Sequence, residues 1–285
     1  MAGKSFVTLQ KLLPQHGLSR LGGAITQSRR PWLKNFLINR FIKAYNINLD
    51  EALSADPNDY GCFNDFFVRE LKPSCRPLAA EPEAIACPAD GAISQMTSIA
   101  SGQLIQAKGH HYRAATLLGS EEDAAPFCDG LFTTIYLSPR DYHRVHMPCA
   151  GTLTKTHYIP GELFSVNQAT TEHLPGLFAR NERLVCFFDS EYGPMAYVMV
   201  GAMMVAGIES SWHGHYRPNP DLMQVQRFDK GQIELQKGDE LGRFRFGSTV
   251  ILLFGKEAIQ WLQTLTPGDS VRQGQLIGSG LASGH

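Results

Sequence analysis

The chain of 285 residues lacks several features that would assign it to a common class of protein. Its six cysteines include no CxxC pair, which argues against a zinc knuckle or a disulfide scaffold and favours a reducing compartment. The N-terminus has no apolar core followed by a small-residue cleavage site, so we expect no signal peptide. The longest apolar run, residues 195–208, falls short of the roughly 20 residues that span a bilayer, and we expect it to form a buried strand.

Acidic residues are missing from the first 49 positions, which carry eight Lys or Arg. The rest of the chain has 18 basic and 27 acidic residues, a net charge of −9, although the whole chain has a net charge of only −1. A basic arm on an acidic body indicates an anionic partner for the arm. Because its basic residues are diluted among Leu, Ile and Phe, an anionic membrane surface is favoured over nucleic acid.

The pattern of apolar residues, glycine and proline divides the sequence into a helical region and a β-rich region. Apolar residues gather on one side of a helix over residues 33–45, although Trp32, Lys34 and Phe36 interrupt the pattern. Such a helix either packs on its own domain or lies on a membrane. From about residue 83, short strands separated by glycine and proline follow. We therefore predict an α+β fold with a basic amphipathic helical region (1–70) and a β-rich catalytic domain (71–285).

Repeated turns indicate how the β-rich part is built. Residues 88–93 and 148–153 share a Pro-x-x-Gly turn before an apolar strand, which indicates a duplication. Residues 267–278 have the turn and strand rhythm of a biotinyl or lipoyl carrier, but no lysine stands at a hairpin tip, so a carrier function is disfavoured. The sequence predicts a mainly β core that resembles a barrel-sandwich hybrid.

Asp90, His146 and Ser248 have the composition of an acid, base and nucleophile set. A serine hydrolase is one interpretation, although its Gly-x-Ser-x-Gly elbow is missing. A zinc hydrolase that uses the histidines is another, and its HExxH motif is missing. The third is self-cleavage, because the hydroxyl of a serine that follows glycine in a bent loop can attack the preceding carbonyl. Asp90 before Gly91 also suits an ordinary turn, and either histidine can be structural.

Over most of its length the sequence resembles the bacterial phosphatidylserine decarboxylases, which are pyruvoyl-dependent, membrane-associated and made as proenzymes. One departure is Phe246, where the family usually has Leu, and the segment around His213 and His215 matches no motif of the family. The segments that carry the resemblance are residues 63–69, 88–91, 106–110, 136–148, 160–167, 177–183 and 247–249.

The resemblance implies that Asp90, His146 and Ser248 form a self-cleavage triad. The chain would split between Gly247 and Ser248 into a β chain (1–247) and an α chain (248–285), and Ser248 would become a covalent pyruvoyl group, with no metal. This group forms a Schiff base with the amine of phosphatidylserine and accepts the electrons that CO2 leaves behind.

His143 is the candidate proton donor in decarboxylation, facing the same site as His146. The ordinary histidine pKa of about 6.5 suits such a transfer. The implied product is phosphatidylethanolamine. The implied partners are phosphatidylserine in an anionic membrane and the two subunits of one proenzyme. A homodimer is possible, and no nucleic-acid partner is expected. The implied location is the cytoplasmic face of the cell membrane, as a peripheral protein.

Overall fold

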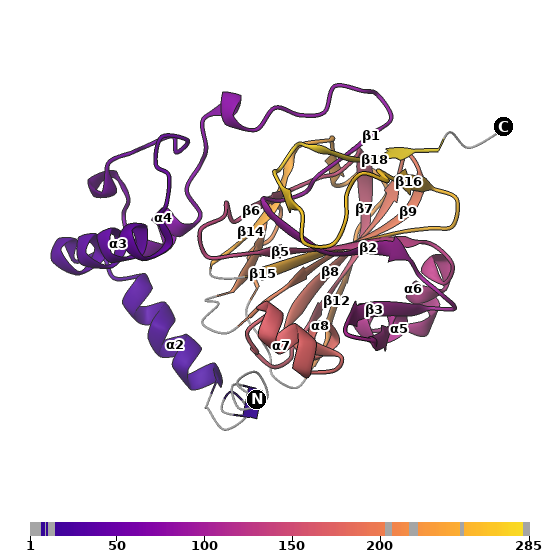
Figure 1. Ribbon diagram of the computed structural model, residues 1–285, viewed down its shortest axis with the longest axis horizontal. Helices are drawn as coiled ribbons and strands as arrows, with labels where there is room; N and C mark the ends of the chain where they lie inside the picture. The colour runs from indigo at the N-terminus through magenta and orange to yellow at the C-terminus, as the bar shows by residue number, and fades with distance from the viewer. Residues whose placement is uncertain are drawn as a thin grey trace.

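The computed structural model describes residues 7, 8, 10, 15–202, 207–216, 222–245 and 248–281. A group of N-terminal helices lies beside a body made mainly of β-strands (Figure 1). The α-helices are α2 (Gln15–Thr26), α3 (Pro31–Tyr45), α4 (Phe63–Phe67), α5 (Ala114–Leu118), α6 (Glu121–Ala124), α7 (Gln168–His173) and α8 (Leu177–Arg180), and the 3-10 turns are η1 (Pro57–Asp59), η2 (Pro73–Cys75) and η3 (Ala125–Phe127). The predicted α+β fold with a mainly β core is confirmed.

The strands form one large sheet and three smaller ones, and their pairings are antiparallel. In the large sheet the order is β12 (Gln224–Arg227), β7 (Gly151–Ile159), β8 (Arg183–Ser190), β9 (Gly193–Val200), β15 (Ser248–Phe254), β5 (Leu131–Leu137), β2 (Gly91–Ser98) and β17 (Ser270–Val271), with β13 (Glu234–Leu235) on β7. The smaller sheets are β11 (Gly214–His215), β10 (Ile208–Ser210), β14 (Glu240–Phe244) and β6 (Arg144–His146); β1 (Ala84–Ala86), β18 (Leu276–Gly280) and β16 (Ile259–Trp261); and β3 (Gln103–Ala107) with β4 (His110–Arg113). Within the described residues the large sheet does not close into a barrel.

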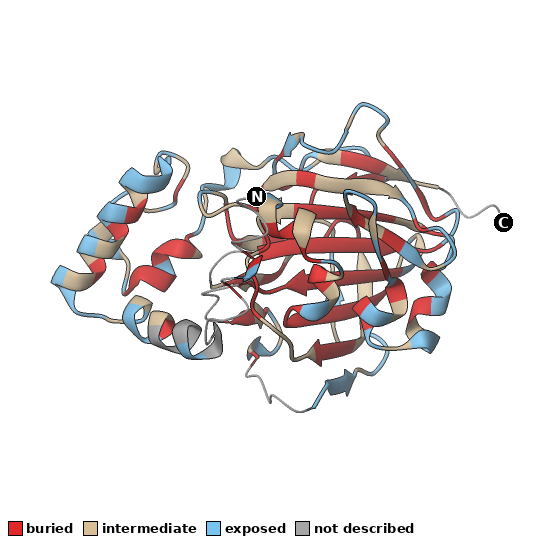
Figure 2. Ribbon diagram, turned by 60° about the horizontal axis from the view of Figure 1, so that its bottom comes forward, coloured by how far each residue is buried: buried red, intermediate tan, exposed pale blue. Residues whose placement is uncertain are grey.

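Strand β15 lies near the middle of the large sheet, between β9 and β5. Alternate residues of the strand enter two different hydrophobic cores: Val250 and Leu252 belong to one, and Ile251 and Leu253 to the other. Every residue of β15 is buried, and Figure 2 shows the same for much of the central sheet. A strand that is covered on both faces needs an unbroken apolar sequence instead of an alternating one, which explains the run that follows Ser248.

We predicted that the apolar run 195–208 forms one buried strand, and this prediction is wrong. It contains most of β9 and the first residue of β10, and residues 203–206 between them lie outside the described part of the chain. The two strands belong to different sheets, since β9 is in the large sheet and β10 is in the four-stranded sheet. A run of apolar residues cannot show where a chain changes sheet when both sheets share a core.

The echo between residues 88–93 and 148–153 is part of a structural repeat. Segment 86–93 pairs with 269–276, and segment 146–153 pairs with 233–240 in the same way. The matching backbone bonds join Cys87 to Gly274 and Gln275, and Met147 to Gly238 and Asp239, with distances of 2.9, 2.7, 2.9 and 2.9 Å. The two segments also bond each other, since the N–H of Ala86 donates to Pro148 and the N–H of His146 donates to Pro88. In this repeat the counterpart of Asp90 is Ala150.

The N-terminal helices have a small core of their own, made mostly of aromatic residues on α3 and α4. Pro31 at the first turn and Asn46 in the left-handed conformation bound helix α3. Lys34, which interrupts the predicted apolar side, is buried because its ammonium donates to backbone carbonyls of residues 57, 58 and 60. Trp32 and Phe36 are instead exposed, at 68 % and 63 %. None of the helices in the described ranges is both long and apolar enough to cross a bilayer. The boundary at residue 70 stays a prediction.

Candidate active site

Ser248 lies at a corner where the chain passes from the four-stranded sheet to the large sheet. Strand β14 ends at Phe244 and strand β15 begins at Ser248. The connection from β5 to β6 turns the same corner, because β5 pairs with β15 and β6 pairs with β14. Ser248 is opposite Leu137, the last residue of β5. Two connections of the chain therefore meet here, and residues 246 and 247 of one of them, the predicted cleavage site Gly247 included, lie outside the described residues.

The side chain of Ser248 is fully buried, and its Oγ has no hydrogen-bond partner among the described residues. A buried hydroxyl usually finds a partner, because leaving one unpaired costs about 1–3 kcal/mol. The hydroxyl of the next residue, Thr249, is also buried and unpaired. The start of β15 thus holds two hydroxyl groups that form no hydrogen bond with the described part of the chain.

His143 lies at the same corner, and its ring is enclosed by the N-terminal helical region. The ring of Phe67 on α4 is 4.1 Å from the His143 ring, measured between centroids, and His143 is fully buried. Its Nδ1 is 2.8 Å from the carbonyl oxygen of Asp141. A carbonyl only accepts, so Nδ1 carries the proton and donates it. The Nε2 of the neutral ring is then a free acceptor, and it is buried without a partner in the described part of the chain.

Burial lowers the pKa of His143 to about 3, against an ordinary value of 6.5. The carbonyl of Asp141 opposes this shift, and the charge of Arg69 adds to it. The pKa of His143 is therefore well below the ordinary value that its predicted role as a proton donor assumes. At neutral pH the ring is a base with one available nitrogen, and it must first take up a proton before it can donate one.

His146 has different surroundings from His143. It is the last residue of β6, where it pairs with Glu240 at the start of β14, so it lies away from the corner by about 10 Å along the strand. Its Nδ1 donates to the carbonyl of Gly238 at 2.9 Å, and its Nε2 accepts from the hydroxyl of Tyr142 at 3.3 Å. Burial lowers the pKa of His146, while the charge of Asp90 is among the groups that oppose this shift.

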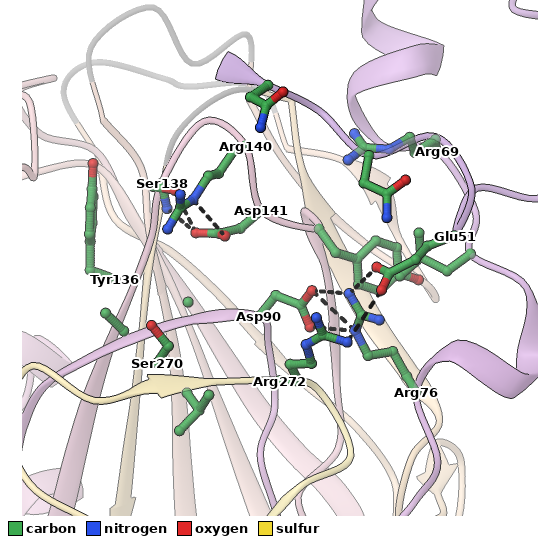
Figure 3. Close-up of a pocket in the computed structure, with 17 residues that line it drawn as sticks. Glu51, Arg69, Arg76, Asp90, Tyr136, Ser138, Arg140, Asp141, Ser270 and Arg272 are labelled. Carbon is green, nitrogen blue, oxygen red and sulfur yellow. Dashed lines mark hydrogen bonds and ion pairs between the residues drawn. The ribbon is translucent and has the colours of Figure 1, made fainter. Parts of the chain in front are cut away.

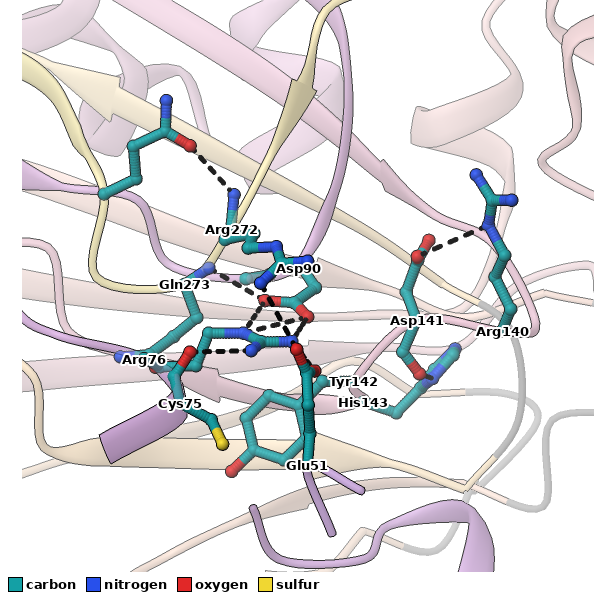
Figure 4. A network of polar contacts seen from close by, with 12 residues as sticks. Glu51, Cys75, Arg76, Asp90, Arg140, Asp141, Tyr142, His143, Arg272 and Gln273 are labelled. Atoms are coloured by element: carbon teal, nitrogen blue, oxygen red, sulfur yellow. Dashed lines mark hydrogen bonds and ion pairs between the residues drawn. The ribbon is translucent and has the colours of Figure 1, made fainter. Parts of the chain in front are cut away.

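Asp90 is held by an arginine and a backbone amide instead of a histidine. The Nε of Arg76 donates to its carboxylate at 2.8 Å, and the N–H of Gln273 donates to the same oxygen at 2.9 Å (Figure 4). Arg76 also pairs with Glu51 at 2.8 Å. In the described residues, then, Asp90, His146 and Ser248 are not joined by hydrogen bonds, although the field of Asp90 reaches His146.

Two neighbouring cavities separate the predicted triad residues. The larger, of about 480 Å³, is lined by Asp90 and by Tyr136 and Ser138, which flank Leu137 on β5 (Figure 3). The smaller, of about 350 Å³, is lined by His146. Leu71, Arg76 and Tyr142 line both cavities and so lie between them. Ser248 lines neither.

Several residues of this site were not predicted from the sequence. Phe67 covers His143, Val68 accepts a bond of 2.8 Å from the Arg144 guanidinium, and Arg69 lines the larger cavity. All three belong to residues 63–69, which carried part of the family resemblance without an assigned role. Arg76, the partner of Asp90, lies in an irregular segment, and no pattern in the sequence marks it.

A zinc site would need a cluster of His, Cys, Asp or Glu side chains. The described residues contain no group of three such side chains arranged to hold a metal. The ring of His213 stacks on Tyr216 with 4.4 Å between centroids, and His215 belongs to the short strand β11. Neither residue belongs to the lining of the two cavities described above.

The lowered pKa of His143 predicts a pH dependence of stability. Because the folded-state pKa is below the unfolded one, the unfolded chain binds the proton first, and stability falls as pH drops from about 6.5 towards 3. Between pH 7.5 and 5.5 the contribution of His143 to the free energy of unfolding should fall by about 1.4 kcal/mol. Urea titrations of uncut Ser248→Ala protein with and without His143→Asn measure it, since other histidines cancel in the difference. Equal pH slopes for the two proteins would contradict the prediction.

Comparison with known proteins identifies the family of the chain. A family model described as phosphatidylserine decarboxylase matches residues 63–279, and a second, described as PSD, matches residues 5–46. The phosphatidylserine decarboxylase proenzyme of Ectopseudomonas mendocina (strain ymp) is 54 % identical over 283 residues, which cover 98 % of this chain and 99 % of that protein. Proteins of the same name from Pseudomonas putida (strain W619) and Bordetella petrii are 53 % and 51 % identical over 97 % and 95 % of this chain, and 98 % and 96 % of their own. The chain belongs to the phosphatidylserine decarboxylase family.

Proposed function

We propose that this chain decarboxylates phosphatidylserine to phosphatidylethanolamine and CO2, using a pyruvoyl group that it makes from Ser248. The observation that carries the proposal is the buried hydroxyl of Ser248 at the first position of a central strand, which has no hydrogen-bond partner among the described residues. The relatives are named proenzymes, which is consistent with a chain that must be processed. A hydroxyl with no structural bond to lose fits a residue that is later converted to something else.

In the proposed self-cleavage, the Oγ of Ser248 bonds to the carbonyl carbon of Gly247 while the bond from that carbon to the Ser248 nitrogen breaks. The Oγ proton leaves to a base and the nitrogen gains a proton, so an amide becomes an ester. A base then removes the Cα proton of residue 248, and the ester C–O bond breaks to release the Gly247 carboxylate. The remaining enamine takes up water and loses ammonia, which leaves a ketone at the new N-terminus. The products are a β chain of residues 1–247 and an α chain of residues 248–285.

We propose Asp90 and His146 as the acid and base of this cleavage. For that role His146 must exchange its bonds with Gly238 and Tyr142, and Asp90 must share its carboxylate with Arg76. The Nε2 of His143 is already free and lies at the corner, so it is the competing candidate for the base. Variants of each histidine separate the two assignments.

The pyruvoyl group supplies an electrophilic carbonyl for the substrate amine and accepts the electron pair that CO2 leaves behind. The buried start of β15, enclosed by the corner, suits such a carbonyl because water is excluded there. In the proposed reaction, His143 takes a proton from the substrate and later returns it. The substrate ammonium must lose a proton before its nitrogen can attack, and the neutral Nε2 takes it. The same proton is then returned to carbon after CO2 has left, so an acid with an ordinary pKa is not required.

We also place the enzyme at the cytoplasmic face of the cell membrane, as a peripheral protein. Trp32 and Phe36 are exposed one helical turn apart on α3, and Arg40 follows one turn later on the same exposed side. Aromatic and basic side chains on one helix face suit the boundary between lipid head groups and acyl chains. The homodimer stays a prediction.

Replacing Trp32 and Phe36 together with serine should weaken binding to anionic vesicles by about a hundredfold or more, because each exposed ring contributes roughly 1.5–3 kcal/mol when it is buried in lipid. Sedimentation with phosphatidylglycerol vesicles measures the change. Val225→Ser, which removes an exposed apolar residue from β12, is the matched control and should bind as the wild type does. Equal binding by all three proteins would remove α3 from the membrane contact.

Two measurements on one preparation test the proposed function. The intact mass shows whether the wild type is cut and whether the α chain begins with a ketone in place of serine. Release of CO2 from serine-labelled phosphatidylserine shows the reaction. An uncut chain that retains Ser248 and is active would overturn the pyruvoyl mechanism and favour a hydrolase-like use of the serine.

A further inference from the structure

The guanidinium of Arg69 is buried but lacks acceptors for part of its donor set. Arg69 lies just after α4 and is 5 % exposed. Its Nε and Nη1 have no hydrogen-bond partner among the described residues, while the ring of Phe66 lies 5.3 Å from its central carbon. A buried cation without paired hydrogen bonds is costly, so such an arrangement is retained where the donors have another use.

Arg69 is one of the residues that line the larger cavity (Figure 3). Three other arginines line this cavity, and each has a carboxylate: Arg76 pairs with Asp90, Arg272 with Glu51 at 3.2 Å, and Arg140 with Asp141 at 4.0 Å. Figure 3 draws no such contact for Arg69. Arg140 and Arg272 are largely exposed, whereas Arg69 is buried and, among the described residues, has no carboxylate partner. Arg69 is thus the buried arginine of this wall whose donors remain for an anion.

The position of the cavity connects α3 to the strand pair that holds Ser248. Asn46, which ends α3, lines one side of the cavity, and Tyr136 and Ser138 of the β5 end line the other. Its volume of about 480 Å³ falls within the range of about 300–1,000 Å³ that is usual for small-molecule sites. A head group in this cavity would therefore contact both the C-terminal end of α3 and the end of β5 that pairs with the start of β15.

We propose that Arg69 binds the phosphodiester of the phospholipid head group and so positions it for the reaction at residue 248. This rests on the proposed function. Guanidinium donors match the geometry of phosphate oxygens. The carboxylate is the poorer assignment, because it loses its charge as CO2 leaves. A cation that held it would stabilise the substrate more than the transition state and would slow the reaction. The phosphodiester keeps its charge throughout, so holding it costs the chemical step nothing.

Calorimetry with soluble head groups tests this in uncut Ser248→Ala protein, where no turnover interferes. Glycerophosphoserine and glycerophosphoethanolamine share the phosphodiester, and only the first has a carboxylate. Arg69→Gln should weaken both by about 30-fold, and Arg69→Lys, which keeps the charge without the planar fork, by less. Arg113→Gln removes an exposed arginine that pairs with Glu121 outside the cavity, and it should change neither affinity by more than about twofold.

A thermal melt without ligand separates a binding arginine from a structural one. Arg69→Gln should melt at the same temperature or higher, because it removes a buried charge with incomplete pairing. A lower melting temperature with unchanged affinities would assign Arg69 to structure and overturn the proposal.

Two binding results would also overturn the proposal that Arg69 binds the phosphodiester. Loss of affinity for glycerophosphoserine alone would assign Arg69 to the carboxylate, and inorganic phosphate binding as tightly as the diesters would indicate a free-phosphate site. A wild type that binds both head groups but is neither cut nor releases CO2 would overturn the proposed function and leave this site standing.

Discussion

Replacing Ser248 with alanine is expected to leave one uncut chain of 31.5 kDa, whereas the wild type should split into fragments of about 27 and 4 kDa. Alanine removes the only atom of residue 248 that can attack the Gly247 carbonyl, and with it the source of the ketone. Without an electron sink the reaction should return to the uncatalysed rate, a loss of at least about a millionfold. Intact mass and CO2 release from labelled phosphatidylserine measure the two effects.

Thr249→Val is the matched control for this variant. The hydroxyl of Thr249 is also buried and unpaired, it lies on the same strand, and valine has nearly the same shape as threonine. This variant should be cut and active. If it behaved like Ser248→Ala, disturbance of the start of β15 would explain both results, and the chemical role of Ser248 would lose its support.

Replacing His143 with asparagine should give a chain that is still cut but decarboxylates about a thousandfold more slowly, within the range that general acid–base groups usually contribute. Asparagine can keep the bond to the Asp141 carbonyl through its amide, so the main loss is the free Nε2. The effect should fall on kcat more than on KM, because the proton transfer occurs after the substrate is bound. Steady-state kinetics on cut protein measures it.

His146→Asn is the partner experiment, and it should leave the chain uncut. Cleavage followed by gel electrophoresis over time separates the two histidines without any assay of turnover. A His143 variant that stays uncut would move the cleavage base to His143, in agreement with its free nitrogen at the corner. Normal cleavage of the His146 variant would remove His146 from the triad.

The sequence predicted the parts of the site that depend on local pattern. The run after Ser248 is apolar without alternation, and the structure explains it by burial of β15 on both faces. The two Pro-x-x-Gly turns indicated a duplication, and the matching backbone bonds of residues 86–93 and 146–153 agree with it. Each of these features depends on residues that are close together in the sequence.

Features that depend on distant contacts could not be predicted in this way. His143 and His146 are three residues apart and were expected to face one site, but the end of β5 and the pairing with β14 give them different surroundings. Burial lowers the pKa of His143, and Phe67, which packs on its ring, comes from a distant part of the chain. Arg76 holds Asp90 from a segment without regular structure. No local signal reveals such partners.

The position of β15 in the large sheet has a consequence for how the enzyme can be renewed. Residues 248–281 place β15 between β9 and β5, β17 on β2, and β18 between β1 and β16. The uncut chain folds with these strands attached, so its folding does not depend on concentration. If the chain is cut before Ser248 as proposed, an unfolded molecule must recapture a separate fragment, and refolding becomes second order and dependent on dilution. The mature protein would then owe its lifetime to slow unfolding rather than to reversible folding.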